Sequence, residues 1–210
     1  MLPAHPPTVG VILAGGLARR MGGIDKSLLT IRGRTLLRHV ADRLGPQCEG
    51  LIINANGDPG RFAATGLPIV EDSLSGHLGP LAGILAALEW VSASRPMIEW
   101  VASCPSDTPF MPNDLVLKLH EARERLQKPM ACASSGSQVH HAVGLWPVRL
   151  RHDLRDAIAV EDLRSIRKWT NTRGVAHASW ADAPLDPFLN INTSGDLAEA
   201  EAAFECYQDA

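Results

Sequence analysis

Residues 9–27 read VGVILAGGLARRMGGIDKS, an apolar run that leads directly into a glycine-rich, basic turn. The apolar run at 9–13 predicts a buried strand. A P-loop requires Gly-Lys followed by Ser or Thr, but Asp25 stands before Lys26 in this turn. The dinucleotide fingerprint GxGxxG is also absent from the stretch. The sequence therefore predicts a strand followed by a glycine-rich turn of another type.

The chemistry of this turn favours a phosphate ligand. Gly15 and Gly16 allow backbone amides to approach a ligand, because no Cβ atom stands in the way. Arg20 offers a forked contact to phosphate oxygens, and Lys26 adds a point charge. The alternative interpretation is a surface turn with solvated charges. The position directly after a strand favours phosphate binding.

Apolar, β-branched runs alternate with amphipathic stretches along the chain. We expect strands at 9–13, 51–54, 67–70, 98–102, 130–133 and 143–146, and helices at 35–44, 81–93 and 113–126. The region 149–180 is interpreted as a helix, a loop and a short extended piece. This alternation predicts an α/β fold with a mostly parallel sheet covered on both faces.

Ligands of such sheets bind beyond the carboxyl ends of the strands. We therefore expect the loops that start at Ala14, Asn54, Glu71 and Ser103 to share one crevice.

Composition restricts the class of protein. With 210 residues, of which 45% are hydrophobic, the chain can form one globular domain with an ample core. The net charge of −3 argues against a nucleic-acid binder. Apolar runs stay far short of the roughly 20 residues that span a bilayer, and the N-terminus does not resemble a signal peptide. Four widely spaced cysteines without a CxxC pair predict reduced thiols and a cytoplasmic location.

The pattern Leu-Ala-Gly-Gly, three residues, Arg-Met-Gly, two residues, Asp-Lys runs unbroken through 13–26. It resembles the signature of the molybdenum cofactor guanylyltransferases, which are nucleotidyltransferases with a Rossmann-like, three-layer α/β fold. The resemblance implies that the main chain of Leu13, Ala14 and Gly15, with Gly16 beside them, meets a guanine nucleotide. It also implies that Lys26 contacts the phosphates of that nucleotide.

Two polar residues follow the second and third predicted strands. Asn54 has an amide that can bind a base or a ribose. Asp72 can accept hydrogen bonds from the N1–H and amino groups of guanine, or from ribose hydroxyls. Local turn chemistry explains both residues equally well, but the family resemblance implies nucleotide contacts for both. The GPLAGI sequence within 76–84 also resembles a family turn and helix start.

The sequence CPSDTPF places Asp107 just beyond the strand expected at 98–102. Mg²⁺ binds one or two carboxylates together with substrate phosphates and waters, so one fixed aspartate suffices. An aspartate in a tight turn is the structural alternative. The DTPF sequence resembles the family's magnesium site, which implies that Asp107 holds Mg²⁺. Asp114 is interpreted as helix N-terminal charge.

The sequence DPFLNINTSGDL at 186–197 resembles the family motif NxNTPxDL, with Ser-Gly in place of Pro-Glu. The resemblance places Asn190 and Asn192 near the pterin substrate, and on a strand their amides would face the same way. Arg164 resembles the family's substrate-phosphate arginine, with Arg167 as a rival. His140 is interpreted as a structural residue, with a place in the substrate site as the alternative, and His141 is expected to be exposed.

The implied reaction transfers GMP from GTP to the terminal phosphate of molybdopterin, with Arg20, Lys26 and Asp107 as the catalytic residues. A nucleotide-binding half at about 8–112 and a pterin-binding half at about 113–210 are expected within one domain. Transient contacts with molybdoenzymes or cofactor-biosynthesis proteins are also expected. Two alternatives stay open: a CTP-dependent or sugar-phosphate nucleotidyltransferase, and a non-catalytic adaptor that binds nucleotide or cofactor.

Overall fold

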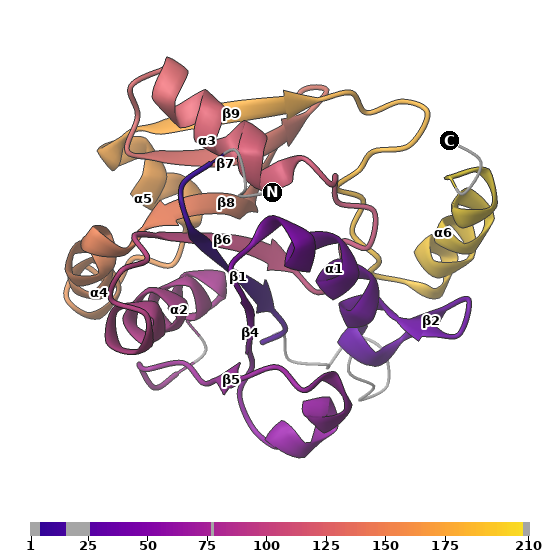
Figure 1. Ribbon diagram of the computed structural model, residues 1–210, viewed down its shortest axis with the longest axis horizontal. Coiled ribbons are helices and arrows are strands. Elements are labelled where there is room, and N and C mark those ends of the chain that lie inside the picture. Colours follow the sequence, from indigo (N-terminus) through magenta and orange to yellow (C-terminus); the bar gives the residue numbers. More distant parts are fainter. Residues whose placement is uncertain (1–4, 16–25, 77, 208–210) are drawn as a thin grey trace.

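The computed structural model describes residues 5–15, 26–76 and 78–207. Its centre is a seven-stranded sheet in the order β5-β4-β1-β6-β8-β7-β9 (Figure 1). The strands are β1 (Thr8–Leu13), β4 (Leu51–Asn54), β5 (Ile69–Val70), β6 (Trp100–Pro105), β7 (Met130–Ser135), β8 (Gln138–Pro147) and β9 (Val175–Trp180). Only β8 runs antiparallel to its neighbours within this sheet. The prediction of a mostly parallel α/β sheet is confirmed.

Helices cover both faces of the sheet, which gives three layers (Figure 1). One core packs α1 (Leu36–Leu44) and α3 (Leu115–Arg125) against one face. A second core packs α2 (Pro80–Ser94), α4 (Arg151–Ala159) and α5 (Ile166–Arg173) against the other. The helices predicted at 35–44, 81–93 and 113–126 correspond to α1, α2 and α3.

The local sequence explains where α1 and α2 begin. The Thr35 side chain accepts a hydrogen bond from the Arg38 amide at 3.2 Å, which caps α1. At the start of α2, Gly79 has φ +70, and Pro80 occupies the first helical turn. Residues 81–88 of α2 are buried without a break. This helix therefore lies between the sheet and α4 rather than at the surface.

The second half of the chain departs most from the sequence prediction. Residues 149–180 form two helices, α4 and α5, followed by β9, which pairs in parallel with β7. The strand predicted at 143–146 is the end of the ten-residue strand β8. Hydrophobic runs reveal a buried strand but not its direction, because direction depends on which neighbour pairs with it.

A further helix, α6 (Ser194–Tyr207), lies beyond the carboxyl ends of the strands (Figure 1). The short hairpin β2 (Thr30–Ile31) and β3 (Arg34–Thr35) was not predicted. A small core joins these elements to α1 through buried apolar residues: Ile31, Leu36, Phe110, Ile191, Ala200 and Phe204.

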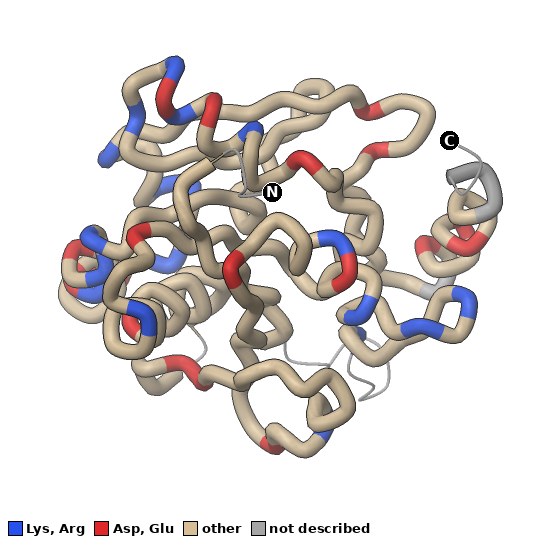
Figure 2. Tube along the Cα trace, in the orientation of Figure 1, with Lys and Arg blue, Asp and Glu red and all other residues tan. Residues whose placement is uncertain are grey.

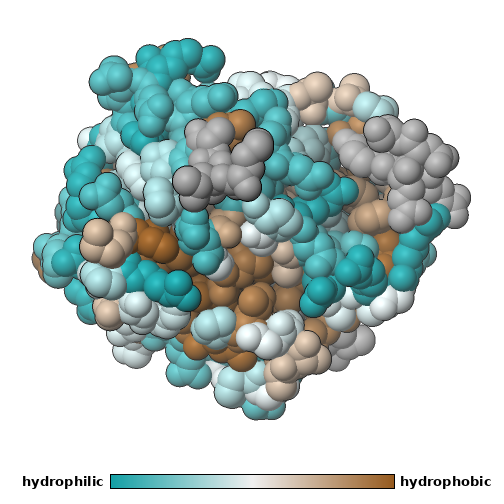
Figure 3. Space-filling model, in the orientation of Figure 1, coloured by the Kyte–Doolittle hydropathy of each residue, from teal (hydrophilic) through white to brown (hydrophobic). Residues whose placement is uncertain are grey.

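Charge and hydropathy are distributed unevenly over the surface. Residues of both signs follow one another along the outer helices and loops (Figure 2). An apolar area shows on one face over β4 and β5, whereas the side chains around α3 are hydrophilic (Figure 3). Half-buried Leu51 and Ile69 belong to those two strands. Within the described ranges, no helix is both long enough and apolar enough to cross a membrane.

Candidate active site

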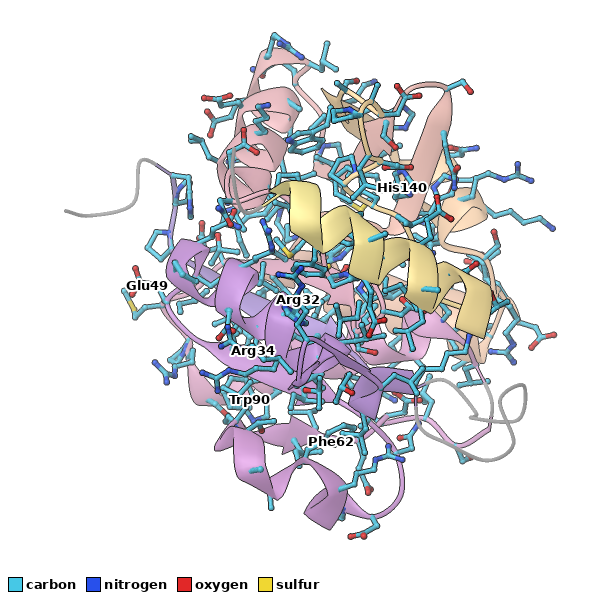
Figure 4. The ribbon with its side chains drawn as sticks, turned by 90° about the vertical axis from the view of Figure 1, so that its right-hand side faces the viewer. Arg32, Arg34, Glu49, Phe62, Trp90 and His140 are labelled. Carbon is cyan, nitrogen blue, oxygen red and sulfur yellow. The ribbon has the colours of Figure 1, made fainter. Side chains whose placement is uncertain are left out.

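A crevice of about 500 Å³ opens at the carboxyl ends of β1, β4, β5 and β6. Figure 4 looks onto this edge of the sheet, with α6 crossing the view between His140 and Phe62. The lining includes most of the residues that the sequence nominated: Leu13, Ala14, Gly15, Lys26, Asn54, Asp72, Asp107 and Asn190. The expectation that the loops after these strands share one crevice is confirmed.

The main chain at the end of β1 is braced on both sides. The Ala14 amide donates to the Asn54 carbonyl at 2.9 Å, and the Ser106 amide donates to the Leu13 carbonyl at 3.0 Å. Gly15 follows at the exposed mouth of the crevice. The backbone of 13–15 is therefore fixed by β4 and β6 before any ligand binds, which suits main-chain recognition of a ligand.

Asn54 and Asp72 meet directly across the ends of β4 and β5. The Nδ2 atom of Asn54 donates to the Val70 carbonyl at 3.1 Å and to Asp72 Oδ1 at 2.9 Å. Asn56, which the sequence analysis did not nominate, donates from Nδ2 to Asp72 Oδ2 at 2.8 Å. Both asparagines line the crevice. The sequence signal for Asn56 was its two-residue spacing from Asn54 in IINAN.

The start of α2 closes this side of the crevice. Gly79 and Pro80 belong to the lining, and a Cβ atom on Gly83 would collide with Asn54 Oδ1. Glycine at this position therefore lets α2 approach β4 closely. The amino end of a fifteen-residue helix carries partial positive charge, which favours an anionic group in the crevice.

Asp107 stands at the opposite wall, just beyond the end of β6. Burial raises the pKa of its carboxyl, whereas a backbone hydrogen bond and Lys26 act in the opposite direction. The Asp107 carbonyl accepts from the Ile191 amide at 3.0 Å, and Thr108 Oγ1 donates to Asn190 Oδ1 at 3.0 Å. These contacts fix the loop after β6 to the segment that carries Asn190.

Lys26 is positioned by a residue far along the chain. Its Nζ atom donates to Asn192 Oδ1 at 2.8 Å. The amides of Asn192 and Thr193 both donate to the Asp196 carboxylate, at 2.7 and 2.9 Å. The backbone hydrogen bond from Asn192, followed by the Thr193 side chain, lowers the pKa of Asp196. The start of α6 therefore holds the partner of Lys26 in place.

The other nominated residues are either outside the described part of the chain or engaged elsewhere. Gly16 and Arg20 lie outside the described residues. Arg164 is absent from the lining, because it pairs with Asp162 and donates to the Ile158 carbonyl at 3.3 Å in the connection between α4 and α5. Residues 189–192 are irregular rather than extended, so Asn190 and Asn192 contact different partners instead of sharing a strand face.

The two adjacent histidines of β8 have different surroundings. His140 is buried, its Nε2 atom lies 2.6 Å from Ser135 Oγ, and its ring centroid lies 4.8 Å from that of Phe188. Burial lowers the pKa of His140, although Asp186 acts in the opposite direction. The expectation of an exposed His141 is wrong: this residue is half-buried. The pairing of β7 with β8 shifts register next to His141, because Ala133 pairs with His140 while Cys132 pairs with Gly144.

The residues present suit a metal that arrives with its substrate. The described residues contain no group of three or more His, Cys, Asp or Glu side chains able to enclose an ion. Asp107 offers one half-buried carboxylate in the crevice, with Lys26 as a nearby positive charge. A hard cation held by one carboxylate, waters and phosphate oxygens fits this donor set.

Comparison with known proteins identifies relatives over nearly the whole chain. Residues 10–177 match the family model of the MobA-like NTP transferase domain. A molybdenum cofactor guanylyltransferase of Nitrobacter hamburgensis is 55% identical over 196 residues, covering 93% of this chain and 94% of that protein. A protein of the same name from Rhodopseudomonas palustris is 52% identical over 197 residues, with 94% of each chain covered.

A solved structure shares the fold. It is titled molybdopterin-guanine dinucleotide biosynthesis protein A, from Archaeoglobus fulgidus, and it superposes with a TM-score of 0.71. The superposition covers 94% of this chain and 98% of that chain, at 20% identity. At this identity the similarity supports the three-layer fold.

Proposed function

Because the chain belongs to the MobA-like NTP transferase family, and within it to the molybdenum cofactor guanylyltransferases, we propose a specific reaction for its crevice. GMP passes from GTP to the terminal phosphate of molybdopterin, which gives molybdopterin guanine dinucleotide and pyrophosphate. One observation carries the proposal: residues from seven separate parts of the chain, from Leu13 to Asn190, line one crevice of about 500 Å³.

The reaction needs positioning more than an activated nucleophile. A phosphate monoester has a second pKa of about 6 and is mostly ionised at neutral pH. One of its oxygens attacks the α-phosphorus of GTP, and the bond from that phosphorus to the oxygen bridging to the β-phosphorus breaks. The leaving group is pyrophosphate. The chain therefore has to align the reactants and stabilise charge on the phosphates.

The nucleotide side of the crevice is assigned to the first half of the chain, about 8–112. The braced main chain of 13–15 holds the nucleoside, and Asn54 with Asp72 binds the base or ribose. Lys26 binds the phosphates. Its ammonium group must then either break its hydrogen bond to Asn192 or keep that bond while it also contacts a phosphate. Arg20 is assigned to the leaving pyrophosphate on the family signature alone.

Asp107 is the residue that we assign to a divalent cation, and we propose Mg²⁺. When bound, the ion neutralises charge on the triphosphate. The raised pKa of the half-buried Asp107 carboxyl supports this role, because a cation would favour the ionised form that desolvation opposes. The single carboxylate supports an ion that retains waters and phosphate ligands.

The acceptor side is assigned to the second half of the chain, about 113–210. Asn190 lines the crevice beside Asp107, and its side chain is held by Thr108. Asn192 acts through Lys26. Arg164 is not included in this assignment, because its guanidinium is engaged between α4 and α5.

Pyrophosphate release tests the proposal directly. The protein is incubated with molybdopterin, Mg²⁺ and either GTP, CTP or ATP, and pyrophosphate is measured with each. We expect release with GTP that depends on molybdopterin. Preferential release with CTP would favour the cytidylyl alternative, and GTP binding without release would favour a non-catalytic adaptor.

A further inference from the structure

We propose that Asn56 is a positioning residue for base selection: it orients the Asp72 carboxylate so that the crevice prefers guanine. This inference rests on the proposed function, because it concerns the nucleotide of that reaction. It adds a residue that the family signature at 13–26 does not contain.

Two amides hold the Asp72 carboxylate, one on each oxygen. Asn54 Nδ2 donates to Oδ1 at 2.9 Å, and Asn56 Nδ2 donates to Oδ2 at 2.8 Å. In return, the Asp72 amide donates to Asn56 Oδ1 at 2.9 Å. Asn56 therefore makes a reciprocal pair of hydrogen bonds with one residue, which fixes both the backbone and the carboxylate of Asp72.

Asn56 is itself held in place from the other side. The Arg61 guanidinium donates to the Asn56 carbonyl at 2.9 Å, and Arg61 stacks on the Phe62 ring at 4.7 Å. Phe62 is buried in the core beneath β4. The short helix at Pro59–Thr65 thus connects the loop that carries Asn56 to the core, so an exposed side chain has a fixed position.

The two remaining acceptor positions of Asp72 match one base. An ionised carboxylate has about four lone-pair sites, and the asparagines occupy one on each oxygen. Guanine presents two adjacent donors, N1–H and the 2-amino group, whereas adenine and cytosine present one donor beside an acceptor. A carboxylate whose two oxygens both face the crevice can accept from both guanine donors at once. Rotation of the carboxylate would lose this match.

The test compares GTP with ITP, because the hypoxanthine base of ITP retains N1–H but lacks the 2-amino group. The two dissociation constants are measured by calorimetry for the wild-type protein, Asn56→Ala and Asn56→Asp. A hydrogen bond to a charged group is worth about tenfold in affinity or more. We expect the wild type to prefer GTP over ITP by about tenfold, and both variants to lower this preference to about twofold.

The variants and a control separate a loss of Asp72 orientation from a general loss of nucleotide binding. Asn56→Asp keeps an oxygen that can accept from the Asp72 amide but removes the donor and adds a like charge. Asn171→Ala, at an exposed position on α5 outside the crevice lining, is the matched control and should retain the full preference. Urea unfolding midpoints of all variants should stay near that of the wild type, because the Asn56 side chain is exposed.

The failure of this inference differs from the failure of the proposed function. If both variants weaken GTP and ITP by the same factor, or leave both unchanged, Asn56 does not orient Asp72 for base selection. If the wild-type protein itself binds CTP or ATP better than GTP, the proposed function fails, whatever the variants do.

Discussion

Replacing Gly83 by alanine tests whether the close approach of α2 to β4 positions Asn54 for the nucleotide. A Cβ atom on residue 83 would collide with Asn54 Oδ1, and it would lie 2.8 Å from Asn54 Cγ and 3.0 Å from Leu13 Cδ2. Asn54 is 3% exposed. Its side chain lies between α2 and the crevice, so a Cβ atom on residue 83 must push it away from its present partners.

Two opposing effects decide the stability of Gly83→Ala. Alanine is favoured over glycine by about 1 kcal/mol in a helix interior. Overpacking of a filled core costs about 1–3 kcal/mol. The free energy of unfolding should therefore fall by only about 0–2 kcal/mol. A fold of this size survives that loss.

The nucleotide site is expected to suffer more than the fold. Displacement of Asn54 breaks its hydrogen bonds to the Val70 carbonyl and to the Asp72 carboxylate. A hydrogen bond to a charged group contributes about 1.5–3 kcal/mol. Because 1.4 kcal/mol corresponds to tenfold in affinity, we expect GTP to bind roughly tenfold to a hundredfold more weakly.

Calorimetric titration with GTP measures this loss, and urea unfolding measures stability on the same samples. Gly50→Ala is the matched control, because a Cβ atom there meets nothing within 4 Å. The control should bind GTP like the wild type. GTP affinity of Gly83→Ala within twofold of the wild type would refute the argument that this glycine positions Asn54.

Three further substitutions test other parts of the structure. Asp107→Asn should lower GTP-dependent pyrophosphate release on the order of 10²–10³-fold with little change in the urea midpoint, and near-normal turnover would exclude Asp107 as the cation ligand. Asn192→Ala should lower kcat/KM for GTP by about tenfold, since Lys26 loses its 2.8 Å partner; an unchanged value would show that this contact is dispensable. Burial, followed by Arg123 and His5, lowers the pKa of His120 to about 3. The pKa of a histidine in the unfolded state is about 6.5, so between pH 6.5 and 3 the unfolded state binds a proton at His120 that the folded state does not. Lowering the pH across this range therefore lowers the free energy of unfolding by up to about 1.4 kcal/mol per pH unit. His120→Phe should reduce that slope in urea titrations at several pH values, whereas the exposed control His152→Gln should not, and equal slopes would contradict the assignment.

The carboxyl-end crevice followed from local sequence patterns. A buried strand appears in the sequence as a run of apolar residues, and an amphipathic helix appears as apolar residues with a 3.6-residue period. The helices α1, α2 and α3 could therefore be predicted directly from the sequence. A parallel sheet then requires the strand ends to meet at one edge. That geometric rule alone predicts that Ala14, Asn54 and Asp72 lie close together.

Other features depend on pairs that are far apart in the chain. Strand β8 is antiparallel because of where it inserts between β6 and β7, and a hydrophobic run carries no information on direction. Likewise, the resemblance nominated Arg164 by position along the chain, but the connection between α4 and α5 places its guanidinium against Asp162. Sequence spacing alone could not reveal that contact.

The sequence by itself determined the three-layer α/β class and the family, and it predicts a phosphate-binding turn after β1. These features are encoded in short stretches, where residue type and spacing directly limit backbone conformation and ligand chemistry. Only the tertiary structure decided that Asn56 holds Asp72 and that Asn192, 166 residues away, holds Lys26. Such contacts form between loops without a repeating pattern, so they exist only once the sheet has brought the loops together.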